Sequence, residues 1–250
     1  MCLIVLAYRQ HPRYRLIVAA NRDEFYRRPT AQAAFWSDQP EVLAGRDLEQ
    51  GGTWLGTTKD GRFAALTNYR DPAAVLASAR SRGELVSDFL RSRMSPAEYL
   101  SQVDQTDRCY NGFNLLVGDT SALLYYSNRT GGIEELGSGI YGLSNHLLDT
   151  PWPKVTKAKA ALAESVRRDE VASEELFAIL GDRTQPPDAV LPDTGVGMEW
   201  ERMLAPAFIA SPEYGTRSST MVLVAYDGSM QFIERTMPGN REVAFHFNIA

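Results

Sequence analysis

Two apolar runs at the start of the chain, separated by a short polar break, constrain the fold more than any other feature. The runs are Cys2–Tyr8 and Tyr14–Ala20, and the break is Arg9–Arg13. Short apolar runs rich in Val, Ile and Leu predict strands, and their near-continuous apolarity predicts burial on both faces. The five-residue break predicts that the two strands pair as an antiparallel hairpin.

The rest of the chain groups into blocks of strands and blocks of helices. Strands are expected at residues 53–57, 62–68, 113–117, 122–127, 141–145, 218–226, 230–236 and 243–249, and helices at 82–93, 96–104, 153–171 and 173–180. Ser81 and Ser95 each precede a glutamate by three residues, which predicts a capping box at each helix start. Residues 185–197, rich in Pro and Gly, predict a mobile loop. Blocks of this kind favour a layered α+β fold with two sheets packed face to face.

Composition narrows the classes of function. The 250 residues carry a net charge of −5 and 44% hydrophobic residues, so we expect one globular domain over residues 1–250. An acidic chain does not favour nucleic-acid binding, and no apolar run is long enough to predict a transmembrane segment. Two cysteines are too few for a disulfide framework or a four-cysteine zinc site, so no metal site and a cytoplasmic location are expected.

Cys2 is placed where it could be a nucleophile. Removal of Met1 would put a thiol and a free α-amine on one residue, and an amine with a pKa of about 7.7–8.0 is partly basic near neutral pH. A neighbouring base is what a cysteine nucleophile needs. The alternative is that Cys2 is a small apolar residue that begins a buried strand. Position alone leaves both interpretations open.

Four polar residues, Asn21-Arg22-Asp23-Glu24, follow the second apolar run and suggest that the chain leaves the core there. In an extended chain Asn21 and Asp23 point one way, and Arg22 and Glu24 the other. A hairpin brings this cluster close to Cys2. The alternative interpretation is a solvated strand end with an Arg–Glu pair.

A set of motifs spread over nearly the whole chain resembles the NRDE family, also called the transport and Golgi organization protein 2 family. The motifs are Met1-Cys2-Leu3-Ile4, Asn21-Arg22-Asp23-Glu24-Phe25, Ala44-Gly45-Arg46-Asp47, Gly51-Gly52-Thr53-Trp54-Leu55-Gly56, Leu66-Thr67-Asn68-Tyr69-Arg70, Gly142-Leu143-Ser144-Asn145 and Gly215-Thr216-Arg217-Ser218-Ser219. The resemblance implies an N-terminal-nucleophile hydrolase fold, a four-layer αββα sandwich.

The resemblance also implies candidate catalytic residues. The related cysteine amidases cleave bile-salt conjugates and penicillin V, and their motif positions match Cys2, Asp23, Asn68, Asn145 and Arg217. An asparagine N–H with a backbone N–H would form an oxyanion hole, and the aspartate would orient the amine. The chain departs from the amidases at Ala20, where they have an arginine.

For the family itself the resemblance implies haem trafficking, or the handling of acyl-CoA or lipid. We therefore expect a small amphipathic ligand as partner, no required cofactor, and haem as a carried ligand. The alternative function is a cysteine amidohydrolase in which Cys2 cleaves a small amide through an acyl-enzyme. A third function, less favoured by the sequence, is that of a scaffold for protein partners. The candidate ligand-binding residues are Asn21, Arg22, Asp23, Glu24, Gly51, Gly52, Trp54, Tyr69 and His146.

Several of these residues have a specific expected role. Gly51 and Gly52 could expose backbone N–H groups to an anion, although an ordinary loop before a strand explains them equally well. Trp54 and Tyr69 would supply flat apolar walls. His146 is the histidine best placed to be an axial haem ligand, because His11 is expected in an exposed turn.

Overall fold

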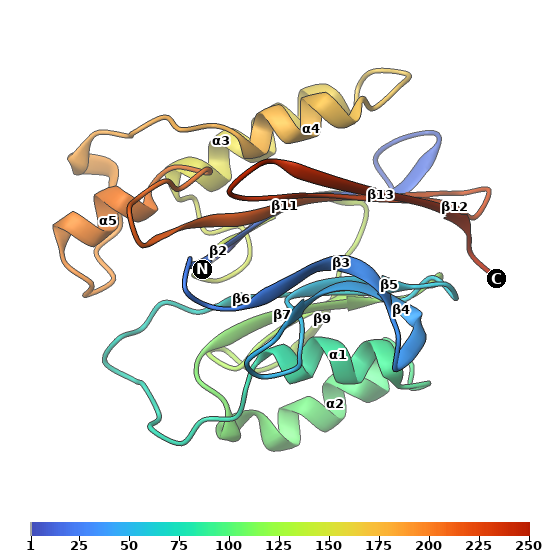
Figure 1. The fold of residues 1–250 in the computed structure, drawn as a ribbon, viewed down its shortest axis with the longest axis horizontal. Coiled ribbons are helices and arrows are strands. Elements are labelled where there is room, and N and C mark those ends of the chain that lie inside the picture. Colours follow the sequence, from blue (N-terminus) through green and yellow to red (C-terminus); the bar gives the residue numbers. More distant parts are fainter. Residues whose placement is uncertain (1) are drawn as a thin grey trace. The chain divides into compact units, whose positions relative to one another are not determined.

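The computed structural model describes residues 2–250, which divide into two compact units (Figure 1). Unit 1 contains the N-terminal residues up to Arg27 together with Gly137–Phe247, and unit 2 contains Arg28–Leu136 and Asn248–Ala250. Each unit is built on one sheet, and helices pack against that sheet. The single domain expected over residues 1–250 stays a prediction.

Unit 1 holds a six-stranded sheet in the order β10-β1-β2-β11-β12-β13. The strands are β1 Cys2–Tyr8, β2 Tyr14–Phe25, β10 Gly139–Leu143, β11 Tyr214–Ala225, β12 Ser229–Thr236 and β13 Arg241–Asn248. β1 pairs with β2 as an antiparallel hairpin, from Cys2 opposite Arg22 to Tyr8 opposite Leu16. The hairpin predicted from the two apolar runs is confirmed.

β2 is longer than its apolar run predicts. It continues through the Asn-Arg-Asp-Glu segment to Phe25, because β11 pairs with it along this whole length. Asn21, Arg22 and Asp23 are 1%, 7% and 1% exposed. The expectation that the chain leaves the core at Asn21, and the alternative of a solvated strand end, are therefore both wrong.

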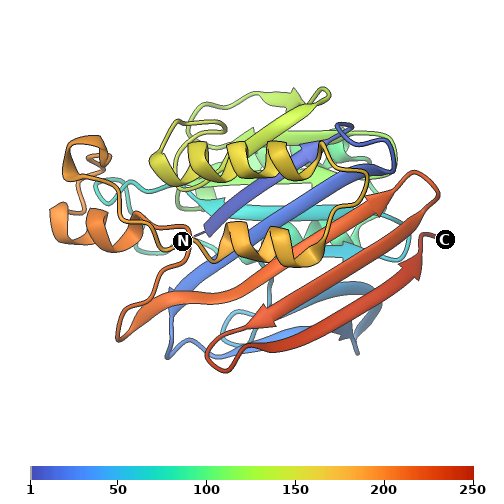
Figure 2. The same ribbon diagram turned by 90° about the horizontal axis from the view of Figure 1, so that it is seen from above.

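Two helices of unit 1 cover one face of its sheet, and Figure 2 shows them lying side by side across the strands. The helices of this unit are α3 Pro153–Ser165, α4 Ser173–Leu180 and α5 Met198–Leu204, with a short 3-10 turn at Asp188–Val190. Leu3, Val5 and Ile17 form a buried core with Leu162 and Leu176 of the two covering helices. α3 ends six residues earlier than predicted, and α5 follows the loop predicted at 185–197.

His11 corrects another expectation. It lies in the β1–β2 turn as predicted, but it is buried, with 4% exposure. Its Nε2 lies 3.0 Å from the carbonyl oxygen of Arg168, and its Nδ1 accepts hydrogen bonds from the backbone N–H groups of Arg13 and Tyr14. The imidazole is buried because it supplies partners to backbone groups that the turn leaves unpaired.

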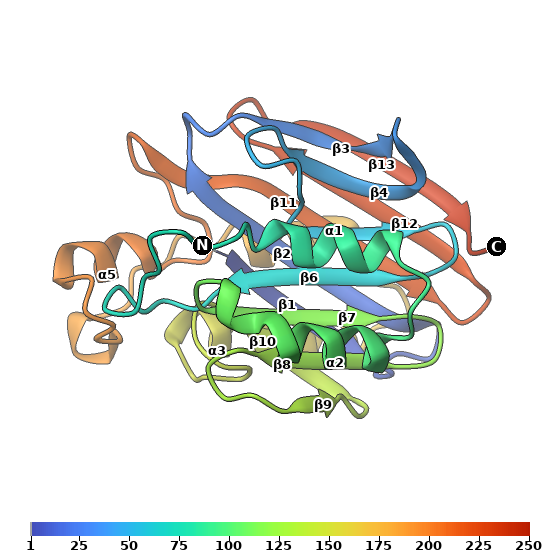
Figure 3. The same cartoon turned by 90° about the horizontal axis from the view of Figure 1, so that it is seen from below.

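Unit 2 holds a seven-stranded antiparallel sheet in the order β3-β4-β5-β6-β7-β8-β9, with α1 and α2 packed against it (Figure 3). Its elements are β3 Thr30–Trp36, β4 Gln39–Asp47, β5 Leu55–Thr58, β6 Phe63–Asn68, α1 Gly83–Arg91, α2 Pro96–Thr106, a 3-10 turn at Asp107–Cys109, β7 Phe113–Gly118, β8 Leu123–Ser127 and β9 Ile133–Glu135. The two helices and the four predicted strands β5 to β8 are confirmed. β3, β4 and β9 carry mixed polar sequences and were not predicted.

One of the two predicted capping boxes forms. At α2 the Ser95 hydroxyl accepts from the Glu98 N–H, and the Glu98 carboxylate accepts from the Ser95 N–H. At α1 the N-cap is Arg82, which makes no side-chain cap, so Ser81 lies one residue too early. No helix within residues 2–250 is both long enough and apolar enough to cross a bilayer.

Candidate functional site

The register of unit 1 places Cys2 in a row of side chains on one face of the sheet. Cys2 is opposite Arg22, and Arg22 is opposite Ser218 of β11. Directly opposite residues of antiparallel strands point to the same side, so these three side chains share a face. Leu3 and Asn21 lie on the other face, which α3 and α4 cover. The Cys2 row is therefore on the face away from these helices.

Cys2 begins β1 and is buried, with 8% exposure. The Ser144 hydroxyl donates to the Cys2 carbonyl oxygen at 3.0 Å. Burial raises the pKa of the Cys2 thiol, and the negative charge of Asp23 adds to this rise. The positive charge of Arg22 and a hydrogen bond from the Asp23 backbone N–H lower that pKa in part. The net effect keeps the thiol protonated near neutral pH.

Arg22 places a nearly buried guanidinium beside Cys2. Its Nη2 lies 3.9 Å from Oε2 of Glu24, which is half-buried on the same strand face. Ala20, the position where the amidases have an arginine, is opposite Ile4 instead. Arg22 thus brings a cation to the Cys2 end of the sheet from a different position of the strand.

Asp23 points to the helix-covered side and belongs to a buried polar network. Its Oδ1 accepts from the Thr216 hydroxyl at 2.7 Å, and the Thr216 hydroxyl in turn accepts from the backbone N–H of Ile209. Burial raises the pKa of the Asp23 carboxyl, and the positive charge of Lys154 opposes this rise most strongly. Sequence reasoning missed Thr216 as a partner, although it lies within the Gly215–Ser219 motif.

Asn21 is engaged by the structure rather than turned toward Cys2. Its Nδ2 donates to the carbonyl oxygens of Leu180 and Ala207 at 2.9 and 2.8 Å, and its Oδ1 accepts from the Ser219 hydroxyl at 2.6 Å. These three bonds join β2 and β11 to the end of α4. They give Asn21 a structural role, and its assignment to ligand binding stays a prediction.

Ser144, Asn145 and His146 follow β10 at the Cys2 end of β1. Asn145 is fully buried, and its Oδ1 lies 3.4 Å from the Ser144 hydroxyl, which binds the Cys2 carbonyl. His146 is half-buried, with Nδ1 2.9 Å from the Thr150 hydroxyl and its ring against Trp152. Burial lowers the pKa of His146, so the imidazole is neutral at physiological pH. The structure thus brings Asn145 close to Cys2.

Arg217 lies in a β-bulge of β11 between Thr216 and Ser218. Its Nη1 donates to the carbonyl oxygens of Phe25 and Tyr26, at 2.9 and 3.1 Å. These bonds hold the chain where β2 ends. The contacts described give Arg217 a structural task, and its catalytic role stays a prediction.

The other predicted residues lie in unit 2. Asn68 ends β6 and is opposite Phe113, and the backbone N–H of Tyr69 donates to Gly112. The N–H of Gly51 donates to the Asp47 carbonyl oxygen, which removes it from the predicted anion nest. Gly52 has a packing reason to be glycine, because a Cβ there would lie 2.6 Å from the backbone of Gly83.

Trp54 of unit 2 lies against Gly45, where a Cβ would meet its indole ring. This close approach explains the glycine of the Ala44–Asp47 motif, and it gives Trp54 a packing role within its own sheet. Among residues 2–250 no group of three or more His, Cys, Asp or Glu side chains is arranged to hold a metal ion. The assignment of His146 as an axial haem ligand stays a prediction.

Comparison with solved structures defines the class of fold. Conjugated bile acid hydrolase from Clostridium perfringens aligns with a TM-score of 0.56 at 10% identity, covering 98% of this chain and 92% of that chain. The Caenorhabditis elegans ortholog of N-acylethanolamine-hydrolyzing acid amidase aligns with a TM-score of 0.54 at 11% identity, covering 89% and 92%. The protein therefore has an α+β fold of the N-terminal-nucleophile hydrolase type, as predicted.

Comparison of sequences then defines the family. The family model described as Transport and Golgi organisation 2 matches residues 1–239. A Transport and Golgi organization protein 2 homolog of Bos taurus is 43% identical, over 96% of this chain and 94% of the relative. That of Homo sapiens is 41% identical, over 95% and 93%. The chain belongs to this family, which confirms the resemblance drawn from its motifs.

Proposed function

We propose that this protein binds and carries a small amphipathic anion, haem or an acyl-CoA, at the Cys2 end of the unit 1 sheet. The observation that supports the proposal is the nearly buried guanidinium of Arg22, which shares a face with Cys2 and Ser218. A guanidinium binds carboxylate or phosphate in bidentate fashion. Haem propionates and the phosphates of CoA are groups of this kind.

The burial of Cys2 suits a carrier site. A thiol whose pKa is raised by burial is a weak nucleophile but a suitable apolar wall. Ser218 adds a buried hydroxyl to the same face. Cys2, Arg22 and Ser218 lie on three neighbouring strands and place an apolar thiol, a cation and a hydroxyl group on one face. This combination suits an amphipathic acid better than a purely apolar ligand.

The proposal is tested by titration with two probes, haemin followed at its Soret band and palmitoyl-CoA followed by calorimetry. Arg22→Gln should raise the dissociation constant of the probe by at least about tenfold, since it removes a charge-assisted hydrogen bond. Arg93→Gln, an exposed arginine after α1, is the matched control and should bind like the wild type. The probe that saturates identifies the ligand class, and saturation of neither probe contradicts the proposal.

His146 tests the haem arm separately. If haem is the ligand and His146 is its axial ligand, His146→Ala should shift the Soret band of the bound haemin and weaken binding. Palmitoyl-CoA binding should be unaffected by the same substitution. A Soret band that is identical in the variant would exclude His146 as the ligand to iron.

A second candidate function is a cysteine amidohydrolase, favoured by the closeness of Cys2 to the backbone N–H of Asp23 and to Asn145 in unit 1. This function needs Met1 to be removed, and Met1 lies outside the described residues. An intact mass that retains Met1 would eliminate the amidase. A mass without Met1, with an acyl-amide probe that labels Cys2 and is lost in Cys2→Ala, would support it.

We also propose that the protein acts in the cytoplasm. Both cysteines are free thiols, and Cys109 is exposed. An exposed free thiol persists most readily in a reducing compartment.

A further inference from the structure

Lys154, the second residue of α3, is a buried lysine that neither the family motifs nor the proposed function uses. It is 6% exposed, and its Nζ donates to the carbonyl oxygen of Leu204, the last residue of α5, at 2.9 Å. A buried ammonium group is costly unless an opposite charge lies close by.

The surroundings of Leu204 lead from Lys154 to Asp23. Leu204 packs in one buried cluster with Ile209 and Tyr214. The Tyr214 hydroxyl donates to the Asp23 carbonyl oxygen at 3.1 Å. The backbone N–H of Ile209 donates to Thr216, whose hydroxyl donates to the Asp23 carboxylate. The lysine and the carboxylate therefore belong to one buried region under α3 and α5.

The direction of these hydrogen bonds partly offsets the effect of burial on the pKa of Asp23. The Thr216 hydroxyl accepts from the Ile209 N–H, so its own proton is directed to Oδ1 of Asp23. A carboxylate oxygen that accepts such a bond is stabilised in its ionised form. Asp23 is 1% exposed, and Lys154 is a buried cation on the same, helix-covered side of the sheet.

We infer that Lys154 is a positioning residue for the Cys2 end of the sheet: its ammonium group is the counter-charge of the buried Asp23 carboxyl group. The inference rests on the proposed function of that strand end as the ligand site. Lys154 would thereby connect helix α3 to Asp23, whose charge acts on the Cys2 thiol. The charged and titratable groups around Asp23 are then Lys154 of α3, Cys2 of β1, Arg22 of β2 and Tyr214 of β11.

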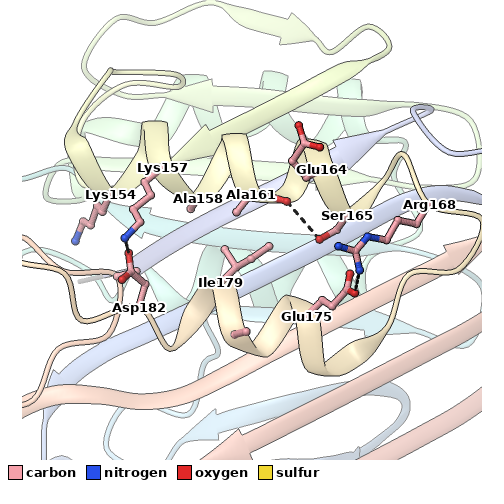
Figure 4. A pocket seen from close by; sticks show the side chains of 12 residues that line it. Lys154, Lys157, Ala158, Ala161, Glu164, Ser165, Arg168, Glu175, Ile179 and Asp182 are labelled. Atoms are coloured by element: carbon pink, nitrogen blue, oxygen red, sulfur yellow. Dashed lines mark hydrogen bonds and ion pairs between the residues drawn. The ribbon is translucent and has the colours of Figure 1, made fainter.

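The same helix offers a matched control. Figure 4 shows Lys154 and Lys157 at one end of the groove between α3 and α4, which has a volume of about 480 Å³. Lys157 also pairs with an aspartate, Asp182, at 2.8 Å, but its side chain is 56% exposed. Exposed ion pairs of this kind contribute little to the stability of a protein. Lys157→Met therefore removes a lysine–aspartate pair from α3 without touching the buried network.

The experiment measures the titration of the Asp23 carboxyl by carbon-13 NMR, with the signal assigned from its absence in Asp23→Asn. In Lys154→Met the midpoint should rise by about one pH unit or more, the effect expected of a close opposite charge. Lys154→Arg should return the midpoint toward that of the wild type, and Lys157→Met should not move it. A midpoint that is the same in Lys154→Met and Lys157→Met would overturn the inference.

A stability cycle keeps the test decisive if Lys154→Met folds poorly. The double variant Lys154→Met with Asp23→Asn should be less destabilised than the sum of the two single variants, because it leaves no buried charge alone. Glu201 of α5 is another buried acid of unit 1, and Thr194 donates two hydrogen bonds to it. A rescue by Glu201→Gln in place of Asp23→Asn would overturn the assignment. Neither measurement uses a ligand, so failure of the proposed function is detected separately, by the haemin and palmitoyl-CoA titrations.

Discussion

A polar side chain is stable inside this protein where each of its hydrogen-bonding groups has a partner, and Asn21 shows this most fully. Its amide satisfies two backbone carbonyl groups and one hydroxyl in a region with almost no solvent. The sequence shows only a polar residue next to charged ones, which is typical of a surface. The partners come from residues about 160 to 200 positions further along, so no local pattern could predict them.

Asn21→Ala should therefore lower the free energy of unfolding by about 2–4 kcal/mol, because it leaves two buried carbonyl groups and the Ser219 hydroxyl without their partner. Urea denaturation followed by circular dichroism measures this. Asn248→Ala, at an exposed position of β13, is the control and should change the free energy by less than about 0.5 kcal/mol. Equal effects would contradict the structural role of Asn21.

The Cys2 thiol gives a second prediction at this scale. Its pKa is raised by burial and by Asp23, so Asp23→Asn should move the pH midpoint of its alkylation downward. Because the folded pKa exceeds the unfolded value of about 8.5, Cys2 contributes stability that is present below that pH and lost as pH rises through the folded pKa. Iodoacetamide labelling across pH, read by mass spectrometry, measures the midpoint. A midpoint that rises in Asp23→Asn would refute the assignment.

At the scale of elements, the sequence predicts most strongly where apolar periodicity is strong. The β1–β2 hairpin and the helices α1, α2 and α4 are of this kind. The end of β2 could not be predicted, since it depends on pairing with β11. β3 was not predicted either, because its short apolar run, Ala33–Trp36, does not distinguish a strand from a helix. α5 follows a stretch rich in Pro and Gly, and its position is set by contacts such as that of Lys154 with Leu204.

The two serine–glutamate pairs test the difference between a local pattern and a formed cap. Ser95→Ala should destabilise the protein by about 1 kcal/mol, because Ser95 caps α2 through its hydroxyl. Ser81→Ala should leave stability unchanged within about 0.3 kcal/mol, because Arg82 is the N-cap of α1 and makes no side-chain cap. Thermal denaturation of the two variants compares them directly. Similar losses would show that both serines cap their helices.

At the scale of the whole molecule, the family and the fold were predictable because several motifs recur together in a fixed order. Each motif combines chemistry with packing. Gly45 and Gly52 each have a packing reason to be glycine, in close contacts with Trp54 and Gly83. The burial of Lys154 could not be predicted, because a lysine in a helix is usually solvent-exposed. The sequence thus identified the family and the fold, but not the buried contacts of residues such as Asn21 and Lys154.

The central proposal is that the ligand binds at the Cys2 end of the unit 1 sheet. Protection of Cys2 from alkylation by the bound ligand tests this proposal most directly. Iodoacetamide labelling of both cysteines is followed by mass spectrometry with and without saturating haemin or palmitoyl-CoA, and the exposed Cys109 is the internal reference. We expect whichever of the two probes binds to slow the labelling of Cys2 and to leave the labelling of Cys109 unchanged. Saturating binding that leaves the labelling rate of Cys2 unchanged would contradict it.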